Sequence, residues 1–345
     1  MSRPIRILIV DDSAFTRHLL VKNLNTYPDI EVVGQSPDGA DALKKMVDLR
    51  PDVITLDVEM PRLGGLDTLE RIMDEQPTPV IMFSALTQSG GRTTIQALLL
   101  GAVDFVLKPS ATIQISDVIE DLVVKIKIAA GTDLKKTQQM PKVQSLPASN
   151  KTQITPFRSD DPVIVIGASA GGPRALRQVL ADFPQNLPAA VIIVQHMPAP
   201  FASAMTQRLD EISPLMVQEA TSGQRLARGL VLVAPGGHHL YFANRKQVAL
   251  NQDPRRNGVR PAVDVSMESA AEQHGKDTIG VILTGMGKDG TSGARHIRKA
   301  GGRIMVEHES TCLVYGMPGS IAKEGLANKI VPLPKVVPTL LDWIE

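Results

Sequence analysis

The sequence has very little of several residue types, and each shortage excludes a class of protein. A single cysteine, Cys312, in 345 residues rules out an internal disulfide and suits a reducing compartment. Aromatic residues are only 3% of the chain, too few for the stacking platforms of single-stranded nucleic-acid binders. No stretch approaches the roughly 18 apolar residues of a membrane span, and Asp11 and Asp12 end the first apolar run too early for a signal peptide. We therefore expect a cytoplasmic protein with no direct membrane insertion.

The chain also lacks an excess of charge of either sign. Its 37 basic and 36 acidic residues give a net charge of +1, so no global field attracts nucleic acid or an anionic membrane. With 43% hydrophobic and 21% charged residues the composition is that of a globular protein, and the length fits two domains. We expect a monomer with no nucleic-acid partner.

Apolar runs alternate with amphipathic stretches through the first 129 residues. Five runs predict buried strands, at residues 5–10, 30–34, 53–56, 80–83 and 103–106. The stretches between them have helical spacing, and a last helix is expected near residues 116–128. A strand–helix alternation repeated in this way predicts a parallel sheet covered by helices on both faces.

A second α/β pattern follows a segment of different character. Residues 130–160 are rich in Lys, Gln, Thr, Ser and Pro and show no period of either kind, which predicts a linker between domains 1–129 and 161–345. In the second domain the pattern predicts strands at 163–166, 190–194, 230–233, 279–283 and 303–306, a hairpin within 241–250, and helices at 174–181, 201–211, 263–274 and 291–300. We expect a doubly wound α/β domain with a mostly parallel sheet.

Carboxylates follow two of the predicted strands in the first domain. Asp11 and Asp12 come after the first strand and Asp57 after the third. In an open parallel sheet functional groups gather beyond the carboxyl ends of the strands, so these acids are expected to converge. Oxygen ligands at this density suit Mg²⁺, which also binds phosphate. Ser84 adds a hydroxyl after the fourth strand, and Lys108 adds a cation after the fifth. Taken singly, each of these residues is more often an ordinary solvated loop residue.

As a set, these strand-end residues resemble the receiver domains of two-component response regulators, over residues 5–129. The resemblance implies a flavodoxin-like, five-stranded parallel sheet, with Asp57 accepting a phosphoryl group from a histidine kinase. It further implies a Mg²⁺ site formed by Asp11, Asp12, Asp57 and the backbone carbonyl of Glu59, a phosphate contact at Lys108, and switch residues at Ser84 and Phe105.

The second domain opens with a strand that runs into a turn of small residues. Residues 167–171 read Gly-Ala-Ser-Ala-Gly, a G-x-S-x-G turn before a predicted helix, which exposes the hydroxyl of Ser169. The amide of Ala170 lies near the helix N-terminus, where it can help to hold an oxyanion. A phosphate-binding glycine loop and a plain tight turn are the alternatives. The segment lacks the middle glycine of G-x-G-x-x-G and the Gly-Lys-Ser/Thr of a P-loop.

A serine nucleophile needs a base and an orienting acid. His196 follows the next predicted strand, at the same sheet edge as Ser169, although a lone histidine there is more often structural. Two acids compete for the third role: Asp289, in a glycine-rich loop after a later strand, and Asp264, in the run Arg-Pro-Ala-Val-Asp. The glycine-rich loop also offers the amide of Met286 near the reacting carbonyl.

The runs GASAGGP, QHM, RPAVD and GMGKDG together resemble the CheB family of chemotaxis protein-glutamate methylesterases, over the whole chain. The resemblance implies a phosphorylation-activated serine hydrolase that demethylates glutamate γ-methyl esters, and deamidates selected glutamines, on chemoreceptors. We expect no cofactor in the catalytic domain. The implied roles are nucleophile for Ser169, base for His196, orienting acid for Asp289, and oxyanion-hole amides for Met286 and Ala170.

Other classes of function fit the sequence less well. The chain order Ser, His, Asp differs from that of the α/β-hydrolases. We find no basic recognition helix of a transcription factor, and no HExxH or CxxC spacing of a zinc site. A nicotinamide-dependent oxidoreductase would need the missing glycine. The remaining alternative is a response regulator of another class with a non-catalytic α/β output domain.

Overall fold

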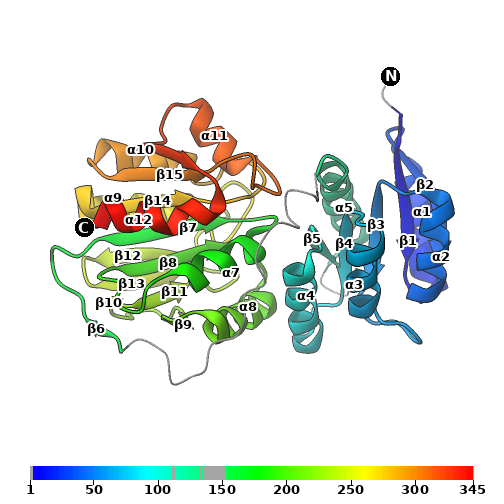
Figure 1. The fold of residues 1–345 in the computed structure, drawn as a ribbon, viewed down its shortest axis with the longest axis horizontal. Coiled ribbons are helices and arrows are strands. Elements are labelled where there is room, and N and C mark those ends of the chain that lie inside the picture. The colour runs from blue at the N-terminus through cyan, green and yellow to red at the C-terminus, as the bar shows by residue number, and fades with distance from the viewer. Residues whose placement is uncertain (1–2, 111–112, 133, 135–152, 345) are drawn as a thin grey trace. The chain divides into compact units, whose positions relative to one another are not determined.

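The computed structural model describes residues 3–110, 113–132, 134 and 153–344 (Figure 1). The chain divides into two compact units, Met1–Gln138 and Gln139–Glu345. Most of the predicted linker, residues 130–160, lies outside the described residues, so the linker and the domain boundaries stay predictions. Among the described helices, none is long and apolar enough to cross a membrane.

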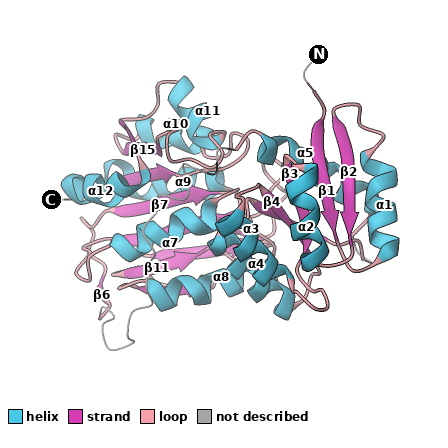
Figure 2. Cartoon of the chain, turned by 45° about the vertical axis from the view of Figure 1, so that its right-hand side comes forward, coloured by secondary structure: helices cyan, strands magenta, loops and turns pink. Residues whose placement is uncertain are grey.

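The first unit is a parallel sheet between two layers of helices. Its five strands pair in the order β2-β1-β3-β4-β5, all parallel. The strands are β1 Ile5–Val10, β2 Ile30–Ser36, β3 Val53–Asp57, β4 Val80–Ser84 and β5 Asp104–Leu107. The helices are α1 Ala14–Leu24, α2 Gly39–Leu49, α3 Gly65–Glu75, α4 Gln88–Leu100 and α5 Ile115–Ala130. α1 packs against α5. On the other side α2 packs against α3 and α3 packs against α4 (Figure 2). The predicted five-stranded sheet is confirmed.

Local sequence explains where these elements begin. The central strands β3 and β4 are buried along their whole length, as expected for apolar runs covered on both faces. Three helices start at a side chain that caps the first free amides: Ser13 for α1, Asp38 for α2 and Thr87 for α4. Because each cap closely follows a strand, the loops at the carboxyl edge of the sheet are short.

The second unit is built on a seven-stranded sheet, again all parallel, in the order β16-β15-β14-β7-β8-β11-β9. Its strands are β7 Val163–Ala168, β8 Ala190–Gln195, β9 Met216–Glu219, β11 Leu230–Val233, β14 Thr278–Ile282, β15 Arg303–Glu307 and β16 Lys329–Val331. Two small antiparallel pairs lie outside it: β6 Thr155–Pro156 with β10 Ala227–Arg228, and the hairpin β12 His239–Asn244 with β13 Gln247–Asn251. The helices are α7 Gly172–Asp182, α8 Ala199–Ile212, α9 Val263–His274, α10 Thr291–Lys299, α11 Met317–Lys323 and α12 Val336–Ile344, with 3₁₀ turns at Gly275–Asp277 and Leu333–Lys335.

The strand order places the candidate residues. The chain starts in the middle of the sheet with β7, builds outward through β8, and later returns to the other side of β7 with β14. The order therefore reverses between β7 and β14, and ligands of doubly wound sheets bind beyond the carboxyl ends of strands at such a point. The doubly wound α/β prediction is confirmed. The short strands β9 and β16, at the two edges of the sheet, were not predicted from the sequence.

Candidate active site and metal centre

The serine turn and the histidine leave neighbouring strands side by side. Ala168 of β7 pairs with Gln195 of β8, and the amide of His196 donates to the carbonyl of Ala168 at 3.2 Å. The side-chain amide of Gln195 donates to the carbonyls of Ser169, at 2.9 Å, and His196, at 3.3 Å. One buried glutamine thus ties the predicted nucleophile and the predicted base to a common frame.

Two glycines allow the chain to pack this closely. A Cβ atom on Gly172 would lie 1.9 Å from Oε1 of Gln195, and one on Gly285 would lie 2.8 Å from Cβ of Ser169. Neither position has room for a side chain. The glycines at these two positions are therefore needed for close approach of the backbone around Ser169.

The predicted base and acid are in contact. Nε2 of His196 lies 2.7 Å from Oδ2 of Asp289, and both side chains are largely buried. Burial alone would raise the pKa of Asp289, but the hydrogen bond from His196 and the amides of Val263 and Asp264 lower it overall. A charged carboxylate can only accept, so Nε2 of His196 carries the proton. The lone pair of the neutral ring is then on Nδ1.

Asp289 is held by a helix N-terminus as well as by the histidine. Its Oδ2 accepts the amide of Val263 at 2.7 Å, and its Oδ1 accepts the amides of Asp264 and Gly290, each at 3.1 Å. Val263 and Asp264 are the first two residues of α9, where free amides and the helix dipole favour a negative charge. The predicted orienting acid therefore has a fixed position and a stabilised charge.

The rival acid, Asp264, does not contact the imidazole. Its Oδ1 accepts the amide of Gly293 at 2.8 Å and its Oδ2 accepts Nδ2 of Asn257 at 2.9 Å. The same Nδ2 lies 3.0 Å from Oδ1 of Asp289, so Asn257 bridges the two carboxylates. Burial, and the nearby charge of Asp289, raise the pKa of Asp264. Asp264 is therefore linked to Asp289 through Asn257 and does not contact His196 itself.

The sequence patterns did not indicate Asn257 as a site residue. The residue has a left-handed backbone, with φ of 53°, followed by Gly258 at φ of 80°. An Asn-Gly pair is a turn signal and asparagine tolerates this region better than most residues. The pair could have predicted the turn, but nothing in the sequence indicates that the Asn257 amide bridges two acids.

Three polar groups in the site have no partner among the described residues: the hydroxyl of Ser169 and the amides of Ala170 and Met286. The hydrogen bond from Ser169 to His196 that the sequence leads us to expect is therefore not formed here. Catalytic hydrogen bonds of unliganded enzymes are often long and tighten only on substrate binding. The two free amides are donors that an oxyanion requires.

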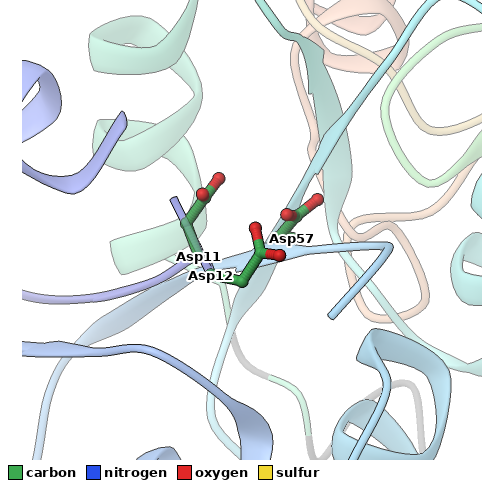
Figure 3. Close-up of side chains that lie close together, drawn as sticks. All are labelled: Asp11, Asp12 and Asp57. Atoms are coloured by element: carbon green, nitrogen blue, oxygen red, sulfur yellow. The ribbon is translucent and has the colours of Figure 1, made fainter. Parts of the chain in front are cut away.

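The acidic cluster of the first unit is assembled as expected from the strand ends. Asp11, Asp12 and Asp57 each offer a carboxylate oxygen, and these atoms lie within 4.8 Å of one another (Figure 3). Asp11 and Asp57 are buried, at 1% and 2% exposure, while Asp12 is exposed. The backbone of Glu59 is adjacent, because its amide lies 3.3 Å from Oδ1 of Asp57. A hard divalent cation fits this all-oxygen donor set.

Lys108 joins the buried acids. Its Nζ lies 2.6 Å from Oδ2 of Asp57 and 3.0 Å from Oδ2 of Asp11. Burial raises the pKa of Asp57 to about 6, against the opposing effect of Lys108. Burial lowers the pKa of Lys108, but the two carboxylates outweigh it and raise the value overall. Because one lysine faces three carboxylates, it compensates their negative charge only in part, and the pocket remains suited to a cation.

The predicted switch residues are both buried. The hydroxyl of Ser84 accepts a hydrogen bond from Oγ1 of Thr94, on α4, at 2.8 Å. Phe105 is 6% exposed, and Nζ of Lys125 lies 5.4 Å from its ring centroid. The bond to Thr94, which the sequence analysis did not anticipate, holds Ser84 to the helix that follows its strand.

Comparisons with known proteins match both units. The family model described as CheB methylesterase matches residues 164–340, and the response regulator receiver domain model matches residues 7–120. A Symbiobacterium thermophilum protein named protein-glutamate methylesterase/protein-glutamine glutaminase is 44% identical over 97% of this chain and 96% of its own length. A Thermotoga maritima protein of the same name is 43% identical over 99% of each chain. The crystal structure of the Thermotoga maritima CheB methylesterase catalytic domain is 42% identical, with a TM-score of 0.52, and covers 53% of this chain and 99% of its own.

Proposed function

The chain belongs to the CheB methylesterase family, and on that premise we propose that it hydrolyses glutamate γ-methyl esters on chemoreceptors and deamidates selected glutamines there. The main support in its own geometry is the 2.7 Å hydrogen bond between Nε2 of His196 and Oδ2 of Asp289. His196 follows β8, which is the neighbour in the sheet of β7, the strand that leads to Ser169. The names of the relatives support glutamate methyl esters and glutamines of proteins as the substrate class, and the family resemblance supports chemoreceptors as the proteins that carry them.

In the first half of the reaction Ser169 attacks the ester carbonyl. Nδ1 of His196 takes the hydroxyl proton as Oγ bonds to the carbonyl carbon, and Asp289 stabilises the imidazolium through Nε2. The amides of Ala170 and Met286 donate to the oxyanion of the tetrahedral intermediate. Breakdown returns the proton from Nδ1 to the leaving oxygen, so methanol departs and an acyl-enzyme remains.

Water then clears the acyl-enzyme by the same route in reverse. Nδ1 of His196 removes a proton from water as the water oxygen bonds to the acyl carbon, and returns it to Oγ of Ser169 as that bond breaks. The product is a glutamate side chain. A glutamine substrate follows the same path with ammonia as the leaving group, which gives the deamidase activity.

The first unit supplies control. We propose that a histidine kinase transfers a phosphoryl group to Asp57 and that this raises the esterase rate. Asp11, Asp12 and Asp57, with the backbone carbonyl of Glu59, would hold Mg²⁺, and Lys108 would contact the phosphoryl group. The bound ion would supply positive charge for the phosphoryl oxygens. The cytoplasm is where such a kinase and the methylated part of a receptor meet this enzyme.

The nucleophile is tested by Ser169→Ala in the full chain. We expect methanol release from methylated receptor, and labelling by a fluorophosphonate probe, to fall to background. Ser222→Ala, which changes an exposed serine of the same unit, should leave both unchanged. Methanol release that persists in folded Ser169→Ala would remove this serine from the mechanism.

Control is tested separately with Asp57→Asn. Acetyl phosphate should raise methanol release by the wild-type chain and leave the variant at its basal rate. An equal response in both would show that the phosphodonor acts elsewhere.

A further inference from the structure

Glu307 is a carboxyl group in the core, close to the nucleophile but unused by the mechanism above. It is the last residue of β15 and is 0% exposed. Among the described residues no lysine, arginine or histidine forms an ion pair with it. A buried carboxyl without a cationic partner is costly, and an apolar residue of the same volume would fill the space at lower cost.

The carboxyl group holds the residue that supports the nucleophile turn. Oε2 of Glu307 accepts the amide of Thr284 at 2.8 Å. The carbonyl of Thr284 accepts the amide of Ser169 at 3.1 Å, and its hydroxyl donates to the carbonyl of Ala170 at 3.0 Å. Thr284 thus forms hydrogen bonds with both Ser169 and Ala170 in the turn, and Glu307 holds Thr284 through its backbone amide.

The same contact reaches the second oxyanion donor. Thr284 is followed by Gly285, whose amide donates to the carbonyl of Val314 at 3.0 Å, and whose carbonyl accepts the amide of Met317 at 2.9 Å. Met286 comes next in the chain. A shift of Thr284 would therefore move the free amide of Met286 as well as Ser169.

Among the described residues the carboxyl group of Glu307 has one hydrogen-bond donor and no cationic partner. The chain after β14 presents the Thr284 amide to Oε2 of Glu307. The other oxygen, Oε1, is buried and has no hydrogen-bond partner among the described residues. In the loop after β15 the Thr311 hydroxyl and the Cys312 thiol lie nearby, but they donate to the backbone carbonyls of His308, at 3.3 Å, and of Glu307, at 3.7 Å. Burial raises the pKa of Glu307 to about 7, against the opposing effect of the Thr284 amide and of the nearby Thr311 and Cys312 side chains. The thiol of Cys312 is the one titratable side chain among these contacts, and the charged neighbour Glu309 is exposed.

We propose that Glu307 is a positioning residue for the esterase reaction, which holds Thr284 so that Ser169 and the Met286 amide keep their places around the reacting carbonyl. This inference rests on the proposed function. It assigns to β15 a role that neither the serine motif nor the glycine-rich loop contains.

The test compares Glu307→Met with Glu307→Gln in the full chain. Methionine fills the volume but accepts no hydrogen bond from Thr284, whereas glutamine keeps a carbonyl acceptor. We expect Glu307→Met to lower kcat for methanol release at least roughly tenfold with little change in KM, the loss expected for one hydrogen bond to a charged group. Glu307→Gln should stay within about twofold of wild type at neutral pH, because its acceptor remains.

Fluorophosphonate labelling separates this inference from the proposed function. The probe reports the position of Ser169 whatever the natural substrate, so its labelling rate should fall in parallel with kcat in Glu307→Met. If the wild-type chain releases no methanol but Glu307→Met still labels slowly, only the proposed substrate is wrong. Glu309→Gln, an exposed acid on the same loop, should behave as wild type.

A folded Glu307→Met chain that labels at the wild-type rate would overturn the proposal. If that variant does not fold, Glu307→Gln decides through its pH profile. The carboxylate accepts more strongly than the neutral acid, so the wild-type kcat should contain an ionisation near neutral pH that the glutamine variant lacks. Identical profiles for the two chains would equally overturn the proposal.

Discussion

Asp289 caps α9, the helix that contains Asp264, and Asp264 caps α10, the helix that Asp289 precedes. Asp289, just before α10, accepts the first amides of α9, and Asp264, in the first turn of α9, accepts the amide of Gly293 in α10. The residues at the usual capping positions, Ala262 and Gly290, provide no side-chain cap. The two helices therefore depend on each other's acids, and the position of the proposed triad acid is fixed by the packing of both.

Exchange of the two acids for asparagine should separate their roles. In Asp289→Asn the side chain cannot accept from both His196 and the α9 amides, and the favoured tautomer of the imidazole changes. We expect kcat for methanol release to fall by roughly 10³–10⁴-fold. Asp264→Asn should lose less than roughly tenfold, because it does not touch the imidazole, and about 1 kcal/mol of stability through the weakened cap. A larger kcat loss in Asp264→Asn would reverse the assignment.

The amide of Asn257 should matter for catalysis although it touches no substrate. It bridges Asp264 and Asp289, with its Nδ2 2.9 and 3.0 Å from their oxygens. Asn257→Gly removes the amide and still permits the φ of 53°. We expect kcat to fall roughly tenfold, the value of one charged hydrogen bond, with KM little changed.

Asn257→Asp is the matched comparison, because it keeps the shape and replaces the donor by a third carboxylate. Its kcat should fall further than that of the glycine variant, owing to repulsion among the acids. Two variants with wild-type kcat in methanol-release assays would show that the bridge is only structural.

The hydrogen bond from Thr94 to Ser84 should restrain the switch. Thr94→Val keeps the shape of the buried side chain but frees the Ser84 hydroxyl to turn toward a phosphoryl group on Asp57. Since such a bond is worth about 1 kcal/mol, half-maximal activation should need roughly fivefold less acetyl phosphate. Thr93→Val, whose hydroxyl bonds only the backbone of its own helix, is the control. A curve for Thr94→Val that overlays the control would exclude the restraint.

Stability should depend on the ionisation of Glu307. Its pKa rises from 4.5 to about 7 on burial, so the folded chain binds this proton more tightly than the unfolded chain. Stability therefore falls as pH rises from about 4.5 to about 7, by up to roughly 3 kcal/mol, and stays reduced above that. Glu307→Gln cannot lose a proton and should be more stable than wild type at pH 8 but not near pH 5.

Calorimetric scans of the full chain would measure this difference. The transition that depends on Glu307 should shift upward in Glu307→Gln at the higher pH alone. Glu309→Gln, at an exposed position, should show no such dependence. An equal shift at both pH values would mean that the carboxyl group does not titrate in this range.

Mg²⁺ should stabilise the unit that contains the acidic cluster. Three carboxylates with oxygens within 4.8 Å repel one another unless a cation lies among them. At about 100 times its dissociation constant Mg²⁺ should add about 3 kcal/mol, seen as an upward shift of one thermal transition that EDTA reverses. Asp12→Asn should abolish most of the shift, whereas Asp48→Asn, an exposed acid on α2, should not. The same shift in Asp12→Asn would place the ion elsewhere.

Local patterns in the sequence were sufficient for most of the architecture. Buried parallel strands have continuous apolar runs, so β7, β8 and β14 could be read directly, and the helix at 263–274 was predicted at its observed bounds. Short edge strands such as β16, with exposed Lys329 and Ile330, carry no comparable pattern and were missed. Motif order likewise indicated Ser169 and His196, because residues after adjacent parallel strands must share an edge.

What depended on the tertiary structure is which groups meet, and in what state of charge. The choice between Asp289 and Asp264, the bridge from Asn257 and the unpaired hydroxyl of Ser169 all follow from segments far apart in the chain. Glu307 follows Thr284 by 23 residues, and no spacing rule predicts that its carboxyl group accepts the Thr284 amide. Ionisation and hydrogen bonding depend on burial and on every neighbour at once, and only the folded chain specifies those.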